Sequence, residues 1–143
     1  MMILRWISVL LFTAVSIFLL WFGFTYMTVE KLLWFHAAAV PEEAQEAIRP
    51  LYFALMNLVG GSSLGLGILS LFVTATSLRQ GMRGAGSVLA ISLAAAFIIA
   101  AITAEELAAQ TGSPTSWHIL GALLLVTFIG WAAQAVSFGS TKH

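Results

Sequence analysis

Two residues of the chain, Glu105 and His118, could act together as a general acid and a general base. Glu105 follows Ala101 at helical spacing on a face of small residues, so we expect its carboxylate to face inward. The adjacent Glu106 points about 100° away, toward lipid headgroups. An imidazole beside a carboxylate is a common general-base arrangement. The pair suggests a lipid or isoprenoid enzyme, and whether the two side chains share a pocket is left open by the sequence.

Four other polar residues are expected near the same end of the molecule. They are Glu30, His36, Arg49 and Asn57. In a binding protein they would line an outward-facing polar pocket for a lipid-like ligand. In the enzyme alternative, Arg49 and Asn57 would orient the substrate. A simpler interpretation is that these charges end membrane helices at the interface, where long side chains reach water cheaply.

Metal, cofactor and nucleic-acid chemistry have little basis in the sequence. The chain has no cysteine, and the spacings from Glu30 to His36 and from Glu105 to His118 match no ligand motif. Haem would need histidines facing each other inside a helix bundle. The formal net charge is zero, so no basic field attracts nucleic acid. We therefore predict no metal, no cofactor and no nucleic-acid partner, with a metal or haem binder as a less favoured alternative.

The composition is that of an all-α integral membrane protein. The 143 residues are 60% hydrophobic and 8% charged, with a mean hydropathy of +0.98. A soluble domain carries roughly 25% charged residues. Four runs lack Asp, Glu, Lys and Arg, and each is long enough to cross a hydrocarbon core of about 30 Å. These runs cover residues 6–29, 51–78, 85–104 and 117–138. The sequence predicts one domain, residues 1–143, folded as an antiparallel bundle of four transmembrane helices.

The connection between the first two spans, residues 31–50, is expected to be a short interfacial amphipathic segment. Its first half contains the apolar run from Leu32 to Phe35, which is too short to cross a membrane. Pro41 is followed by acidic residues, a pattern that predicts a helix start. Arg49 and Pro50 are expected to end this short helix.

The second span carries Asn57, Gly61 and Gly65 at intervals of four residues, along one side of a helix. Small residues at this spacing let membrane helices approach backbone to backbone. We predict that Gly61 and Gly65 form a helix-packing face, either within one chain or between chains. A homo-oligomer or a larger membrane complex would use it in the second case.

The placement of charge predicts the topology. Arg5, Arg79, Arg83 and Lys142 fall on the side that holds both termini, whereas Lys31, Arg49 and all six acids fall on the other side. The positive-inside rule places the first side in the cytoplasm. We expect a multi-pass inner-membrane protein with cytoplasmic N and C termini.

Some local motifs are similar to those of a known group. The Arg49-Pro50-Leu51-Tyr52 stretch leads into a glycine-rich second span, and Gly112-Ser113-Pro114 forms a turn before the fourth. The glycines of that span are Gly60, Gly61, Gly65 and Gly67. This order of features resembles small bacterial four-helix membrane proteins of the DoxX-like kind and related families of unknown function. The resemblance implies a four-helix bundle and no particular activity.

The leading functional hypothesis is a non-enzymatic inner-membrane protein with membrane lipids as partners. It is either an accessory subunit that packs through the Gly61/Gly65 face or a binder of lipid-like ligands. The alternative is the enzyme that uses Glu105 and His118. An oligomeric transporter is less favoured, because no span carries a charge near its middle.

Overall fold

The computed structural model describes residues 2–139, and every regular element in this range is a helix. The elements are α1 (Met2–Met27), α2 (Trp34–Ala37), α3 (Glu42–Val73), the π-helical turn η1 (Thr74–Leu78), α4 (Ala85–Thr111) and α5 (His118–Gly139). Four helices are long and apolar enough to cross a membrane, namely α1, α3 continued by η1, α4 and α5. The prediction of four long apolar helices is therefore confirmed.

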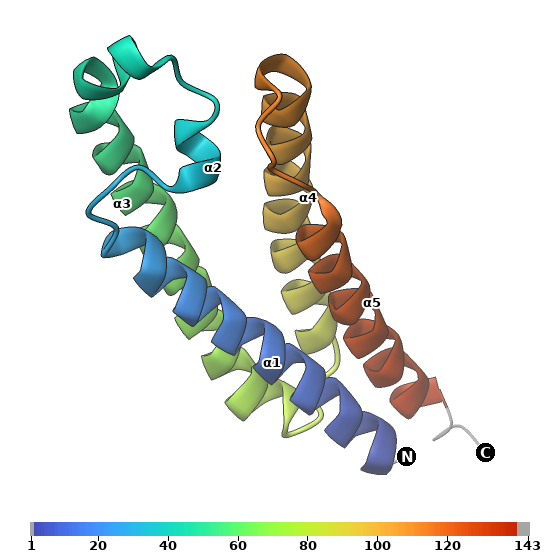
Figure 1. Cartoon of the computed structure of the whole chain (residues 1–143). Coiled ribbons are helices and arrows are strands. Elements are labelled where there is room, and N and C mark those ends of the chain that lie inside the picture. The colour runs from blue at the N-terminus through green and yellow to red at the C-terminus, as the bar shows by residue number, and fades with distance from the viewer. Residues whose placement is uncertain (1, 140–143) are drawn as a thin grey trace.

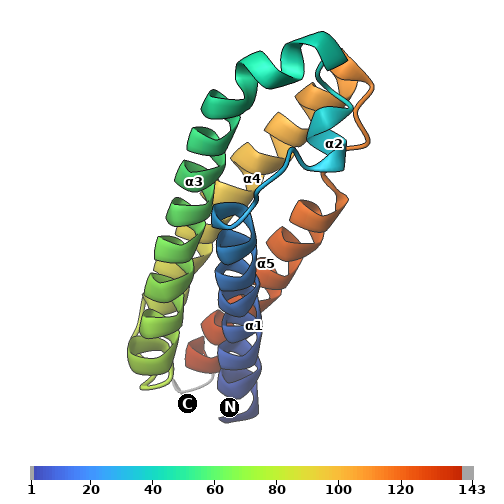
Figure 2. The ribbon, with the colours of Figure 1, turned by 60° about the vertical axis from the view of Figure 1, so that its left-hand side comes forward.

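The long helices form two pairs joined through α1. Helix α1 packs along both α3 and α5, and α4 packs along α5. Helices α3 and α4 are close to each other near the turn that joins them. They diverge toward the opposite end of the molecule (Figure 1). The first residues of α1 and the last residues of α5 lie at the same end of the molecule as this turn (Figures 1 and 2).

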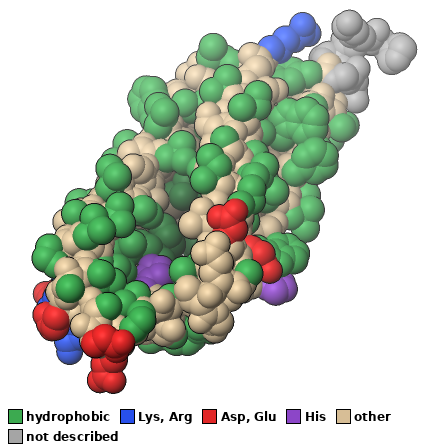
Figure 3. Space-filling model, turned by 90° about the horizontal axis from the view of Figure 1, so that it is seen from above, with side chains coloured by type: hydrophobic (Ala, Val, Ile, Leu, Met, Phe, Trp, Pro, Cys, Tyr) green, Lys and Arg blue, Asp and Glu red, His purple; other side chains and the backbone are tan. Residues whose placement is uncertain are grey.

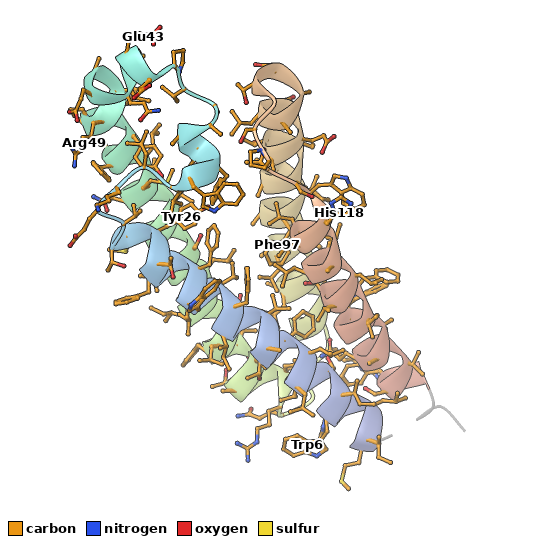
Figure 4. All side chains as sticks on the ribbon, viewed as in Figure 1. Trp6, Tyr26, Glu43, Arg49, Phe97 and His118 are labelled. Atoms are coloured by element: carbon orange, nitrogen blue, oxygen red, sulfur yellow. The ribbon has the colours of Figure 1, made fainter. Side chains whose placement is uncertain are left out.

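Charge divides the two ends of the molecule. The end with the η1–α4 turn, called the basic end, carries Arg5, Arg79 and Arg83. The predicted fourth cation of this end, Lys142, lies outside the described residues. The opposite end is called the acidic end, and Glu43 marks it in Figure 4. Its glutamates are Glu30, Glu42, Glu43, Glu46, Glu105 and Glu106.

The buried core lies in the half nearer the basic end. Its members come mainly from α1 and α4: Phe12, Val15, Leu19, Leu78, Ala85, Leu89, Leu93 and Phe97. Two buried hydroxyl groups beside this core bond to their own helices, since Ser16 donates to the carbonyl of Phe12 and Thr127 to that of Leu123. Such bonds to the preceding turn satisfy a hydroxyl without water. The buried hydroxyls of Ser8 and Thr74 have no hydrogen-bond partner among residues 2–139.

Two glycines set the distance between α1 and α3. A methyl group added at Gly23 would lie 2.7 Å from the carbonyl oxygen of Gly60 and 2.7 Å from the amide nitrogen of Leu64. A methyl group added at Gly60 would lie 2.7 Å from the carbonyl oxygen of Gly23. The two backbones are therefore in contact, which only glycine at both positions permits.

Pro50 does not end a helix, contrary to the sequence-based expectation. It lies inside α3, which begins at Glu42 and continues without interruption past Leu51. A proline in a helix removes one hydrogen bond and bends the axis, but exposed backbone near water tolerates this loss. The first turns of α3 indeed bend away from the rest of the helix (Figure 2). The second half of the predicted interfacial connection is thus the beginning of α3.

Two other helix ends differ from the predicted spans. Helix α4 continues seven residues beyond position 104 to Thr111 and stops at Gly112, whose φ of 68° is the left-handed conformation that glycine adopts easily. Glu105 consequently lies within α4. Helix α1 ends at Met27, two residues before position 29, so that Glu30 lies in the following loop.

Candidate functional site

A cluster of aromatic rings joins α1, α2 and α3 near the acidic end. The rings of Phe22 and Tyr26 stack with centroids 4.1 Å apart, and Tyr26 meets His36 edge-on at 6.5 Å. His36 also contacts Phe35 at 4.4 Å and Tyr52 at 5.5 Å. In Figure 4, Tyr26 lies beneath α2, whose ribbon crosses above it. The cluster fixes α2 on top of α1 and α3.

Tyr52 is the hydrogen-bonding centre of this cluster. Its hydroxyl oxygen lies 3.0 Å from His36 Nδ1 and accepts the backbone N–H of Leu33 at 3.1 Å. With His36 neutral, the tyrosine O–H donates to Nδ1, and both roles of the hydroxyl group are filled. The tyrosine side chain itself is buried. Tyr52 thus attaches α2 to α3.

Helix α2 is also attached to the other helix pair. The hydroxyl of Ser113, in the α4–α5 loop, donates to the carbonyl of Phe35 at 2.5 Å. Thr115 of the same loop donates to the carbonyl of Ala104 at 2.8 Å. Residues 34–37, called the strap, therefore connect the α1–α3 pair to the α4–α5 pair where these diverge. Seen from this end, the surface between the two pairs is hollowed and mostly hydrophobic (Figure 3).

Half-burial lowers the pKa of His36, because desolvation penalises the charged imidazolium. The groups that face its ring are Tyr26 from α1, Phe35 from α2 and Tyr52 from α3, all of them neutral near pH 7. A histidine with a pKa below its ordinary value of about 6.5 binds protons less readily when docked than when released. Docking of the strap is therefore strongest above about pH 6.5 and weakens as the pH falls through the lowered pKa.

We expect amide hydrogen exchange in residues 34–38 to accelerate severalfold between pH 7.5 and pH 5.5, after correction for the intrinsic pH dependence of exchange. Protonated Nδ1 can no longer accept the Tyr52 hydroxyl proton. The variant His36→Gln should exchange at the same corrected rate at both pH values. His118→Gln serves as the control, because His118 is exposed. Unchanged protection of the wild-type strap at pH 5.5 would contradict this role of His36.

The structure does not bring Glu105 and His118 into a common pocket. Both side chains are exposed. The ring of His118 stacks on Trp117 at 4.6 Å, and its Nδ1 atom bonds to the hydroxyl of Ser116. Among residues 2–139, Glu105 has no hydrogen-bond or ion-pair partner. Ser116 does accept the backbone N–H of His118 at 3.2 Å, as a capping residue would.

The four expected ligand-binding residues are also dispersed. Arg49 lies with its guanidinium carbon 5.7 Å from the centre of the Phe53 ring, and Glu30 is exposed in the loop after α1. Glu30 lines a shallow depression formed by residues 28–34, whereas Arg49 lines a neighbouring one. His36 and Asn57 line neither of these two. Asn57 is exposed on α3.

Gly61 and Gly65 face away from the rest of the described chain. A methyl group added at either position would meet no atom within 4 Å. The close contacts of α3 with α1 are made instead by Gly60 and Gly67, since a methyl group at Gly67 would lie 3.1 Å from Leu20. The predicted packing face therefore makes no close contact with any other part of residues 2–139.

Tyr26, Tyr52 and Ser113 were not predicted from the sequence as site residues. Aromatic residues gather at residues 21–26, 34–35 and 52–53, and this clustering was the one available signal for Tyr26 and Tyr52. Ser113 carries no such signal, because its partner is a backbone carbonyl. Within residues 2–139, no group of three or more histidine or acidic side chains could hold a metal ion.

Comparison with protein-family models, curated proteins and solved structures finds no match for this chain. The DoxX-like resemblance therefore stays a prediction from sequence.

Proposed function

We propose that the protein is a non-enzymatic subunit of the inner membrane that associates through the outer face of α3. In this proposal the four long helices cross the membrane as an antiparallel bundle. The positive-inside rule then places the basic end, with both termini, in the cytoplasm. The length and apolar character of the helices and the separation of charge between the two ends support this placement.

The carrying observation is the open glycine face of α3. Gly61 and Gly65 leave a smooth strip with no atom within 4 Å of an added methyl group. Larger exposed side chains border the strip, among them Leu58 and Ile68. Apolar burial does not drive association in lipid, so a strip between larger side chains favours a partner helix through close packing.

Asn57 adds to this face a polar side chain that needs a hydrogen-bond partner. It lies eight residues after Arg49 in the sequence, which corresponds to about 12 Å along the helix. An amide at that depth is surrounded by hydrocarbon, where an unmade hydrogen bond costs free energy. Within residues 2–139, the Asn57 side chain has no hydrogen-bond partner. A partner helix that bonds to Asn57 would remove this cost.

A second copy of the chain fits this face best. In this proposal the charge bias orients every copy of the chain alike, so Asn57 lies at the same depth in each. A two-fold axis along the membrane normal then sets Asn57 opposite Asn57 and glycine opposite glycine. An amide both donates and accepts, so two copies can exchange two hydrogen bonds. We therefore propose a homodimer as the basic unit of the complex.

The double substitution Gly61→Leu and Gly65→Leu is expected to convert the dimer into a monomer without changing helix content. The added side chains enter open space in the monomer but fill the strip that the partner approaches. Asn57→Leu should weaken association by about 3- to 30-fold, since interhelical hydrogen bonds contribute about 0.6–2 kcal/mol. The measurement is molar mass by light scattering in micelles, repeated over a range of protein-to-detergent ratios.

Ala95→Leu is the matched control, because Ala95 is exposed on α4, outside the proposed interface. It should leave the mass unchanged. A wild-type protein that stays monomeric at every ratio, or a double variant with the wild-type mass, would contradict the proposal.

A further inference from the structure

A shallow depression at the acidic end is lined by both cations of that end. Its lining residues are Lys31, Leu32, Ala37, Gln45, Glu46 and Arg49. They come from the loop after α1, the last residue of α2 and the first turns of α3. Lys31 and Arg49 are 18 positions apart in the sequence, and the strap and its loop bring them to the same depression. This surface is separate from the outer face of α3.

The two cations are poorly neutralised although six glutamates share this end of the molecule. The one ion pair among residues 2–139 joins Arg49 Nη1 to Glu46 Oε1 at 3.4 Å, and both side chains are exposed. Exposed pairs of this kind stabilise little. Lys31 has no ion-pair partner in the described range, although the adjacent Glu30 lines the neighbouring depression. The depression therefore carries a net positive charge.

Side-chain contacts hold Arg49 and the surrounding backbone in place beside the depression. The Arg49 guanidinium lies over the Phe53 ring at 5.7 Å, which limits where it can move. Gln45 Nε2 donates to the carbonyls of Ala37 and Val40 at 3.4 and 3.3 Å, which joins α2 to α3 beside the cations. The uncharged run of α3 begins at Pro50, so Arg49 lies at the level of lipid headgroups in a membrane.

We infer that this depression binds the phosphodiester of a glycerophospholipid in the outward leaflet. An arginine offers a planar fork of donors to phosphate oxygens, and a lysine offers a compact charge. Two cations and Glu46 give the site a net charge of +1. A lipid with one negative charge, such as phosphatidylglycerol, complements this charge better than a zwitterionic lipid. Leu32 and Ala37 provide apolar contacts for the glycerol and the start of the acyl chains.

The experiment measures lipid binding to the purified full-length protein in a neutral detergent by native mass spectrometry. The probes are phosphatidylglycerol, phosphatidylcholine, diacylglycerol with the same acyl chains, and inorganic phosphate. Wild-type protein should bind phosphatidylglycerol most tightly and diacylglycerol least. The double variant K31A/R49A should bind phosphatidylglycerol about 30-fold more weakly, about fivefold for each cation removed.

The matched control is R79A/R83A, which removes two exposed cations from the opposite end. It should keep wild-type affinity within about twofold. Glu46→Gln should bind phosphatidylglycerol about twofold more tightly, because it removes the acid that competes for Arg49. This gain cannot come from a folding defect, and far-ultraviolet circular dichroism checks the folding of each variant.

Equal binding of phosphatidylglycerol and diacylglycerol, or equal losses in K31A/R49A and R79A/R83A, would overturn the inference. Displacement of the lipid by millimolar inorganic phosphate would also overturn it, because free phosphate would then be the ligand. The molar mass of K31A/R49A should match that of the wild type. A negative result for lipid binding would therefore leave the dimer proposal unaffected, and a negative result for the dimer would leave the lipid inference unaffected.

Discussion

Substitution of Gly60 by alanine is expected to destabilise the packing of α1 against α3 by about 1–3 kcal/mol, the range for an overpacked interior. The added methyl group would lie 2.7 Å from the carbonyl oxygen of Gly23 and 2.8 Å from the amide nitrogen of Met27. Both contacts are with backbone, so the helices must move apart. Alanine gains about 1 kcal/mol over glycine in a helix interior, which is too little to offset this strain. Gly60→Leu should separate the pair completely.

The neighbouring substitution Gly61→Ala is the control for this experiment. It brings the same gain in helix propensity on the same helix, and its methyl group meets nothing within 4 Å. At a protein-to-detergent ratio low enough to keep the protein monomeric, its stability should equal or exceed that of the wild type by up to about 1 kcal/mol. The measurement is reversible unfolding in mixed micelles, followed by circular dichroism. Similar effects at the two glycines would show that α1 does not pack against α3 at Gly60.

A second large effect is expected for Phe12→Ala. The Phe12 ring is fully buried, and a methyl group added at Gly130 of α5 would lie 3.3 Å from it. In a soluble protein such a truncation costs about 3–5 kcal/mol, part of it for transfer of the ring to water. In lipid the separated helix keeps its ring in hydrocarbon, so only the cavity part remains. We expect a loss of about 2 kcal/mol, measured by the same unfolding experiment.

The substitution Phe24→Ala tests whether a ring that faces lipid contributes little to stability. Phe24 is 64% exposed on α1. In the proposed membrane bundle its ring would touch lipid in both the folded and the separated state, so its removal should change stability by less than about 0.5 kcal/mol. A loss at Phe24 as large as that at Phe12 would mean that a partner covers this face.

The sequence predicted the number of long helices because span length and lack of charge are properties of each segment alone. It could not predict which glycine packs. Gly60 and Gly61 are adjacent and point about 100° apart, so either one could face α1. The spacing favoured Gly61 with Gly65, whereas the structure packs Gly60 against Gly23. The choice depends on how α1 and α3 cross, which no local pattern contains.

The candidate site was harder to predict than the fold. His36 and Tyr52 meet only because the chain turns back after α1 and α3 starts before Pro50. The expectation that Pro50 ends a helix placed Arg49 and Tyr52 in different elements. Glu105 was expected at a helix end facing inward, but α4 continues past it and leaves it exposed. Local periodicity predicted that Glu105 lies on a helix. It did not determine which side of that helix faces the neighbouring helices.

The strap is attached to partners that are synthesised at very different times. Tyr52 follows His36 by 16 residues, whereas Ser113 follows Phe35 by 78 residues. A nascent chain can therefore bind the strap to α3 early, but it cannot join it to the α4–α5 loop until α4 has been made. During this interval the apolar surface of α1 that later meets α5 stays open. The bond from Ser113 to Phe35 can thus form once α4 has been made but before α5 is complete, and a ribosome-bound chain that stops before residue 113 would keep a strap held on one side only.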